Sequence, residues 1–418
     1  MAPKNLLKPI LFSIFMLPLL VAAQISSSPY SFYGLGESAY QGDVYSSAMG
    51  YASIALQDSL HINPINPASY RRDSLDFTFN FAFIAKGYSL KSTTSSQQNF
   101  GGNLNYMSVA FRFFKWWNTS LGLLPYTSTD YKIKFTTTNP QIGNIDNYLN
   151  GTGGTNKVYW GNSFSIKDKL FLGVNASYIF GYMLNYNSVV LPAGEDYFNT
   201  AQRIQKNISD FCFDFGALYK INLGKSLLSV GAIYSPKQTL KGKYTLLNSK
   251  VIYLEYNRMD TIDYMENPNY TTDIPEKIGL GLSYKNNQCL FAIDYSLEKW
   301  KDTNVGQKQN MKNSSSIHIG GEYTPTHNTL SEYYKKMSYR AGLYMDNTNL
   351  YINGESIKKT GITIGATFPL RKIKQSVNLA LDFGKMGTLA NNLIEQYYIT
   401  LRVGMNLHEI WFIKSKIQ

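Results

Sequence analysis

The sequence predicts an all-β fold, a transmembrane β-barrel of about 14 antiparallel strands whose lumen holds an N-terminal hatch. Three observations predict this class. The chain ends in a strand with one apolar and one polar face, candidate strands recur before it, and the links between them alternate between short and long. No apolar stretch after Gln24 approaches the roughly 20 residues that a spanning helix needs. Because lipid tolerates no unpaired backbone groups, only a closed barrel remains as the membrane structure.

The last predicted strand, which starts at Glu395, shows the alternation most clearly. Ile399, Leu401, Val403, Met405 and Leu407 share one face, and Thr400, Arg402, Gly404, Asn406 and His408 share the other. Reversing the strand would place Arg402 against hydrocarbon at a cost of about 2–4 kcal/mol. The same test places Val377, Leu379, Leu381 and Phe383 outside, and likewise Phe291, Ile293, Tyr295 and Leu297.

Thirteen further candidate strands precede it, which gives roughly fourteen in all. They span 77–88, 103–116, 120–135, 157–166, 170–189, 208–221, 226–246, 275–284, 288–300, 315–324, 338–350, 358–368 and 376–385. Short links fall near 117, 168, 223, 286 and 371, with a longer one at 325–337; the opposite links, at 89–102, 136–156, 190–207, 247–274 and 301–314, are long. This asymmetry is typical of periplasmic turns opposite outside loops and places both chain ends in the periplasm.

The N-terminus predicts export. Lys4 and Lys8 precede an apolar run at 10–20, and small residues at 21–23 offer a cleavage site. Residues 1–23 therefore read as a signal peptide, and the predicted location is the bacterial outer membrane. A soluble β-sandwich is the alternative fold, but it would need neither the signal peptide nor aromatic strand ends. Those aromatic residues are Trp116, Trp117, Tyr284, Trp300 and Trp411.

Composition argues against other classes of function. The net charge of +12 could suggest nucleic acid, but many basic residues fall in predicted short turns, where charges are simply solvated. The chain contains two cysteines, Cys212 and Cys289, which are too isolated for a disulfide framework or a metal site. The four histidines show no zinc-ligand spacing, and no catalytic elbow or triad is present. We therefore predict no enzyme, no cofactor, no metal and no nucleic-acid partner.

Residues 24–72 do not read as a strand and are predicted to be the hatch, followed by the barrel at 73–418. Glycines interrupt this segment, and Asn63-Pro64 and Asn66-Pro67 mark turns. The alternative is a disordered periplasmic tail, but such tails are usually poor in the aromatic and aliphatic residues found here.

A family resemblance follows from this segment. The small-residue run, Asp58 and Asn66-Pro67-Ala68, directly before the first strand, resemble the N-terminal hatch of FadL-type channels for hydrophobic compounds. The opening residues 28–36 and the ending Trp411-Phe412-Ile413-Lys414 are similar to the Bacteroidota branch. The resemblance implies a fourteen-stranded barrel, a hatch turn at Asn66, Pro67 and Ala68, and a kinked third strand that opens the wall sideways.

The third predicted strand contains Gly122 and Pro125, and a proline in a strand removes a ladder hydrogen bond. These two residues are the candidate lateral opening; alternatively, Pro125 only ends a strand and begins a bent loop. Five charges are predicted to face the lumen and to pair with one another or with the hatch: Asp214, Asp294, Arg340, Asp382 and Arg402.

Two functions remain open. In the first, the barrel is a passive channel in which the outside loops at 190–207 and 247–274 gather a hydrophobic ligand, which leaves sideways near Pro125. In the second, the barrel is a structural subunit of a larger outer-membrane machine, for barrel assembly or type 9 secretion. The expected surroundings are the lipid bilayer and lipopolysaccharide, with other complex subunits as partners in the second case.

Overall fold

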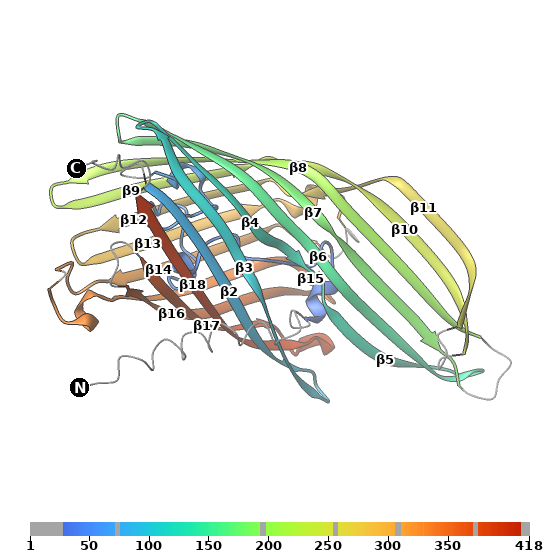
Figure 1. The fold of residues 1–418 in the computed structure, drawn as a ribbon. Helices are drawn as coiled ribbons and strands as arrows, with labels where there is room; N and C mark the ends of the chain where they lie inside the picture. The colour runs from blue at the N-terminus through green and yellow to red at the C-terminus, as the bar shows by residue number, and fades with distance from the viewer. Residues whose placement is uncertain are drawn as a thin grey trace, which may run out of the picture.

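The computed structural model describes residues 28–71, 76–192, 198–253, 258–305, 311–328, 330–370 and 375–410. These residues form one antiparallel sheet of 18 strand segments that closes on itself, because the last strand pairs with the first long one (Figure 1). The predicted signal peptide at 1–23 and the C-terminal Trp411-Phe412-Ile413-Lys414 lie outside the described residues.

Three spanning strands are bent into two segments each, which explains why 18 segments make a 14-strand barrel. The bent pairs are β4 (Trp117–Ser128) with β5 (Tyr131–Asn139), β9 (Ser226–Ser235) with β10 (Gln238–Tyr253), and β11 (Arg258–Ile274) with β12 (Lys277–Lys285). The short β1 (Glu37–Ser38) belongs to the N-terminal segment. The predicted strand count is confirmed.

The remaining strands follow the chain around the barrel. They are β2 (Asp76–Lys91), β3 (Ser96–Phe114), β6 (Gly143–Ile166), β7 (Leu170–Val190), β8 (Asn199–Leu223), β13 (Cys289–Glu298), β14 (Ser314–Tyr323), β15 (Ser338–Ile352), β16 (Glu355–Pro369), β17 (Ser376–Gly387) and β18 (Glu395–Ile410). Closure is continuous, since β18 pairs with β2 from Glu395↔Lys91 to Ile410↔Asp76.

Burial follows the predicted faces. On β13, Ile293 is 46% exposed while its neighbour Asp294 is 3% exposed. On β18, Ile399 and Leu401 are exposed while Thr400 and Arg402 are buried. The apolar side chains therefore point outward, toward the hydrocarbon of a bilayer, and the polar ones point into the lumen.

The turns at one rim are short, and that rim also holds the end of β18 (Figure 1). One prediction is off by two residues: the turn expected at Trp117-Asn118 lies at Lys115-Trp116, and Trp117 already begins β4. The connections also contain the short helices η4 (Trp300–Asp302), η6 (Tyr333–Lys336) and η7 (Ala390–Asn392). Among the described residues, no helix is both long and apolar enough to cross a membrane.

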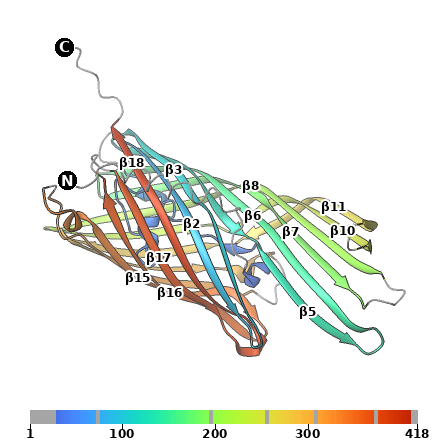
Figure 2. The ribbon, with the colours of Figure 1, turned by 60° about the horizontal axis from the view of Figure 1, so that its bottom comes forward.

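The prediction of long outside loops is wrong at four places. Residues assigned to loops at 89–102, 136–156, 190–207 and 247–274 lie largely in strands that continue beyond the barrel. We call the sheet formed by β5, β10 and β11 with the adjoining ends of β6, β7 and β8 the wing; it extends to the right in Figure 1 and remains separate in Figure 2. Its strands are partly exposed on both faces, so they lack the apolar–polar alternation that identified the other strands.

The N-terminal segment, residues 28–71, runs through the inside of the barrel and is drawn in blue in Figures 1 and 2. It contains η2 (Pro29–Phe32), β1, α2 (Val44–Ser47) and η3 (Pro67–Ser69). The Asp43 side chain caps α2 by accepting a hydrogen bond from the Ser46 N–H. Val44, Ala48, Met49, Ala52 and Ala68 are fully buried, so the segment has a packed interior of its own against the wall.

The outward orientation of the apolar side chains of β13 gives a first prediction. Ile293→Lys should destabilise the folded barrel by about 2–4 kcal/mol, because a lysine would replace an apolar side chain at mid-strand against hydrocarbon. The free energy of folding into bilayers, from urea titration, measures it. Ile262→Lys, on β11 in the wing, is the matched control, because Ile262 is 63% exposed but lies beyond the barrel. Equal effects of the two substitutions would contradict the assignment of lipid and water.

Candidate functional site

Inward-facing glycines of the barrel wall form the surface on which the N-terminal segment packs, which we call the glycine seat. Three pairs lie directly opposite each other on neighbouring strands: Gly173 and Gly216, Gly231 and Gly281, and Gly320 and Gly342. At each of these glycines, an added Cβ would meet atoms of the N-terminal segment closer than real Cβ contacts allow, in most cases backbone atoms. The lumen wall can therefore contact the segment's backbone directly, which larger side chains would prevent.

The predicted hatch turn lies on this seat. Asn66 is fully buried; its amide donates to the carbonyls of Ile54 at 2.7 Å and Ala217 at 3.2 Å, and its Oδ1 accepts from the Ala68 N–H at 3.0 Å. Pro67 begins η3, where its missing N–H is no loss. The Ala68 carbonyl accepts from Ser163 Oγ at 3.1 Å. The three residues thus connect two parts of the segment to β6 and β8.

Asp294 holds the segment from β13. Its Oδ2 accepts the backbone N–H groups of Ser53 at 2.5 Å and Ile54 at 2.8 Å. Asp294 is 3% exposed, and in the described part of the chain its carboxylate accepts hydrogen bonds from these backbone donors of the segment. Displacing the segment would leave a buried carboxylate without those hydrogen bonds, which is costly.

Asp382 and Arg402 hold it from the other side of the lumen. Tyr51 lies between them: its hydroxyl donates to Asp382 and accepts from Arg402 Nη1 at 3.0 Å. Tyr344 also donates to Asp382, at 2.7 Å. The direct separation of Arg402 and Asp382 is 3.9 Å, so the tyrosine hydroxyl completes the ion pair.

The other two predicted lumen charges lie apart from this cluster. Asp214 faces Lys157 at 3.6 Å and accepts from Ser235 Oγ at 2.6 Å. Arg340 donates to Glu322 at 2.7 Å, and its guanidinium lies 4.0 Å from the centre of the Tyr45 ring. The structure therefore brings Asp382 and Arg402 together and places the other three at separate points around the N-terminal segment.

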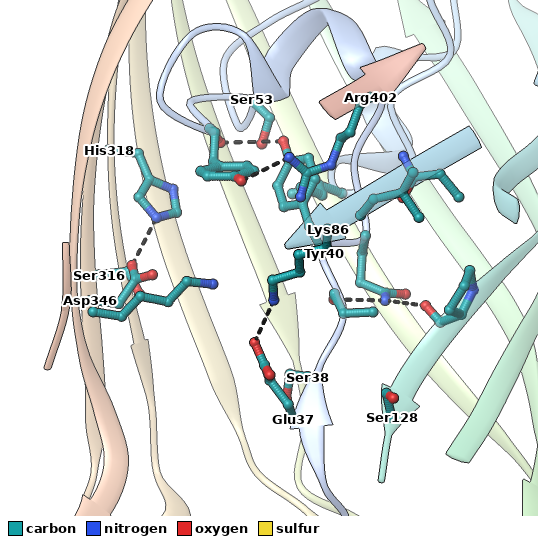
Figure 3. A pocket seen from close by; sticks show the side chains of 18 of the residues that line it. Glu37, Ser38, Tyr40, Ser53, Lys86, Ser128, Ser316, His318, Asp346 and Arg402 are labelled. Atoms are coloured by element: carbon teal, nitrogen blue, oxygen red, sulfur yellow. Dashed lines mark hydrogen bonds and ion pairs between the residues drawn. The ribbon is translucent and has the colours of Figure 1, made fainter. Parts of the chain in front are cut away.

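Two adjoining voids lie beside the segment, with cavity volumes of about 310 and 300 Å³. The first is lined partly by aliphatic side chains, including Ile54, Ile65 and Ile84, and partly by charges. Figure 3 shows two ion pairs in the lining of this void: Lys86 with Glu37, at 3.1 Å, and His318 with Asp346, at 3.0 Å. The lining is therefore mixed, with an apolar wall and several ion pairs.

Glu37 stays ionised in this setting. Burial raises the pKa of its carboxyl, but the ammonium groups of Lys86 and Lys359 outweigh that effect and hold the pKa below its ordinary value. Lys359 lines both voids, and no ion pair is found for it within the described residues. A cation whose charge also acts on Glu37 and Asp346 thus borders the cavity.

The first void lies where β3 and β4 separate. These strands pair only from Phe114↔Trp117 to Met107↔Leu123. Beyond that point β3 continues to pair with β2, while β4 continues to pair with β6. Among the described residues, 96–106 of β3 therefore have no partner on the β4 side.

The N-terminal segment covers the edge that β3 leaves. Glu37 and Ser38 of β1 pair with Ser128 and Thr127 of β4. The Ala39 N–H then donates to the Tyr126 carbonyl at 2.9 Å, and Gln41 Nε2 donates to the Pro125 carbonyl at 2.7 Å. The edge of β4 is thus paired by the segment inside the barrel rather than by the wall.

Gly122 and Pro125 occupy different places along this separation. Pro125 lies within β4, lines the first void and sits at a register shift against β6. Gly122 lies before the split, still paired with Ser108, and makes room for the buried Tyr159 ring. The alternative in which Pro125 ends its strand is wrong, because β4 continues to Ser128.

Sequence reasoning missed the glycine pairs and the two-residue β1. Inward glycines at mid-strand were visible in the sequence as small residues on polar faces, but the pairing required the register of neighbouring strands. A strand as short as β1 has no period to detect. In the described residues no group of acidic, histidine or cysteine side chains could hold a metal ion, and both cysteines are free.

Comparisons with known proteins agree on the fold. The toluene transporter TodX of Pseudomonas putida is 15% identical over 91% of this chain and 99% of its own, with a TM-score of 0.56. The Ralstonia pickettii toluene transporter TbuX is 15% identical over 88% and 98%, with a TM-score of 0.57. A Pseudomonas aeruginosa FadL homologue is 12% identical over 91% and 100%, with a TM-score of 0.59.

These identities are low, so the three structures establish a FadL-like barrel fold and not an activity. A family model described as BamG matches residues 5–418. A search among curated proteins gave no match.

The glycine seat gives a second prediction. Gly342→Ala should loosen the N-terminal segment at a cost of about 1–3 kcal/mol, because the new Cβ would overlap the backbone of Met49 and Gly50. Hydrogen exchange of residues 44–56 would measure the loss of protection. The matched control is Gly87→Ala, where an added Cβ makes only an ordinary 3.7 Å contact with Phe100. Unchanged exchange in the Gly342 variant would argue against the seat.

Proposed function

The chain belongs to the BamG family, and we propose that it is an outer-membrane channel through which small hydrophobic molecules leave sideways between β3 and β4. Residues 24–72 act as the hatch of this channel, and residues 73–418 form its wall. The observation that carries the proposal is the void at the point where β3 and β4 separate. A hole in the wall would let an apolar ligand pass into the bilayer without crossing the periplasm.

The mixed lining of the void suggests the class of ligand. Aliphatic side chains such as Ile54, Ile65 and Ile84 suit an apolar body, whereas Lys359 and the Glu37–Lys86 pair suit one polar group. We therefore propose small molecules with an apolar body and a single polar group. Two proteins of similar fold, TbuX and TodX, are toluene transporters, which supports this size of ligand.

Passage requires the hatch to move at β1. This strand is held by a two-residue ladder to β4, by the hydrogen bonds of Ala39 and Gln41, and by the ion pair between Glu37 and Lys86. The deeper part of the hatch, around Asn66-Pro67-Ala68 and Asp294, has more buried contacts. Local release of β1 opens the void while the deeper part stays in place.

A substitution that fills the void between β3 and β4 gives a third prediction. Asn103→Trp should lower uptake by about tenfold, because Asn103 borders the void on β3 and an indole would fill it. Uptake of labelled toluene and of benzyl alcohol is measured in cells that display the protein in a lipopolysaccharide outer membrane. Asn144→Trp, on the distant tip of β6, is the control. Unimpaired uptake of both probes by a folded Asn103 variant would reject lateral exit.

A second candidate function is a structural subunit of a larger outer-membrane assembly. The ion pairs that line the lumen favour it, because a hydrocarbon gains nothing from Lys277–Glu298, Lys157–Asp214 or Glu37–Lys86. These pairs serve equally well to fix the hatch in a barrel that never opens. The wing also offers partners a surface outside the membrane.

Isolation from membranes separates the two functions and gives a fourth prediction. For a channel, the protein extracted in mild detergent should migrate as the barrel alone, with small-molecule uptake as above. Stoichiometric co-purification of other proteins, together with uptake equal to that of cells lacking the barrel, would identify the structural subunit. Native mass spectrometry of the extract gives the composition.

A further inference from the structure

The wing leaves a long strand edge without a partner. β11 is registered with β10 over its whole length, from Gln238↔Ile274 to Tyr253↔Arg258. On the other side, β13 pairs with β12. This ladder ends at Lys277↔Glu298 and does not continue onto β11. Within the described residues, no strand registers with that second edge of β11 (Figure 1). Such an edge presents unpaired N–H and C=O groups to an additional strand.

The edge strand also exposes three large apolar side chains. Residues 260–269 are exposed along the whole stretch. Ile262 is 63% exposed, Tyr264 57% and Met265 48%. Because they extend beyond the barrel, lipid does not cover these side chains, and apolar groups exposed together favour an interaction site.

The charged side chains along this edge of β11 indicate what kind of partner strand would bind there. Asp260 and Asp263 lie on one face, opposite Lys250 and Asn248 of β10, and neither is ion-paired within the described residues. On the other face, Glu266 pairs with Lys243 at 2.6 Å. The hydrogen bond from Lys243 lowers the pKa of Glu266, so this carboxylate is ionised at neutral pH.

Self-pairing through this edge is disfavoured. Two β11 strands side by side would oppose carboxylates to carboxylates, and like charges across a strand pair are destabilising. Pro268 and the register shifts along β11 interrupt a regular ladder, which also protects an edge from indiscriminate pairing. Pairing with a cationic strand is favoured, because its lysine or arginine side chains would face Asp260 and Asp263.

We propose that the free edge of β11 is a docking edge for an extended, lysine- or arginine-rich strand of a partner protein outside the membrane. The partner adds a strand to the wing: main-chain hydrogen bonds provide affinity, and the carboxylates select its charge. The site is independent of passage through the lumen, so a failure of lateral exit does not affect it.

Peptide binding to the full-length barrel in lipid nanodiscs tests the proposal. The probe is a fluorescent peptide of about twelve residues that alternates valine or threonine with lysine, long enough to cover the exposed part of the edge. It should bind and slow hydrogen exchange in residues 259–272. Two comparison peptides, one with glutamate for lysine and one N-methylated at alternate residues, should not bind. Equal binding of the N-methylated peptide would show charge attraction alone and overturn strand addition.

Variants then locate the site. Asp260→Lys with Asp263→Lys should weaken binding of the lysine peptide by about tenfold, because two attractive cross-strand pairs become repulsive. The control is Asp302→Lys in η4 with Glu355→Lys at the start of β16, an equal change of net charge at the same end of the barrel. Equal loss in both double variants, or no binding by the unaltered protein, would reject the docking edge.

A second copy of the chain is the alternative occupant. The strand β5 forms the opposite edge of the wing. It carries Lys132 and Lys134 and is antiparallel to β11. If β5 of another copy fills the β11 edge, the protein will form oligomers in nanodiscs sized for several barrels, and Lys132→Glu will disperse them. That outcome would overturn the proposal of a separate partner.

Discussion

Backbone hydrogen bonding in hydrocarbon is the constraint on which the whole structure depends. A spanning strand with an unpaired edge is too costly in lipid, so the sheet must close, and the long ladder between β18 and β2 closes it. Three strand edges in the described chain lack a partner: 96–106 of β3, the outer edge of β11 and the outer edge of β5. The first adjoins the void and the other two lie in the wing beyond the barrel, so each unpaired edge coincides with a place where the molecule can meet something else.

Closure also brings the N-terminal segment into contact with the polar inner face of the wall. Charges that are buried between the two need partners. Asp294 finds them in the backbone of Ser53 and Ile54, and Tyr51 joins Asp382 to Arg402. The paired glycines let that backbone come close enough to the wall. The N-terminal segment is therefore held by direct polar contacts with the wall, and its removal would leave several buried groups unpaired at once.

How well the sequence predicted each strand depends on whether its side chains face lipid, the packed lumen or water. Alternation around Ile293 and Leu401 was readable because lipid lies on one side and the packed lumen on the other. Parts of the wing were read as loops, because residues such as Ile262 and Tyr264 lie in a stretch exposed along its whole length, which removes the periodic signal. Pro125 was recognisable from its missing N–H. Glu37-Ser38, which pair with the nearby Ser128 and Thr127, were not, because two residues define no pattern and the contact spans about ninety positions of chain.

The strand β1 contributes both to closing the wall and to holding the N-terminal segment in the lumen. Its backbone pairs with β4 on one side of the separation, and the Glu37 side chain reaches Lys86 of β2 on the other. One short segment therefore bridges the gap that β3 leaves, using few hydrogen bonds and one partly buried ion pair. The glycine seat and Asp294 act farther down the lumen on different residues. The proposed opening at β1 would therefore not require release of the whole N-terminal segment, and only the contacts of β1 need to be weak enough to break reversibly.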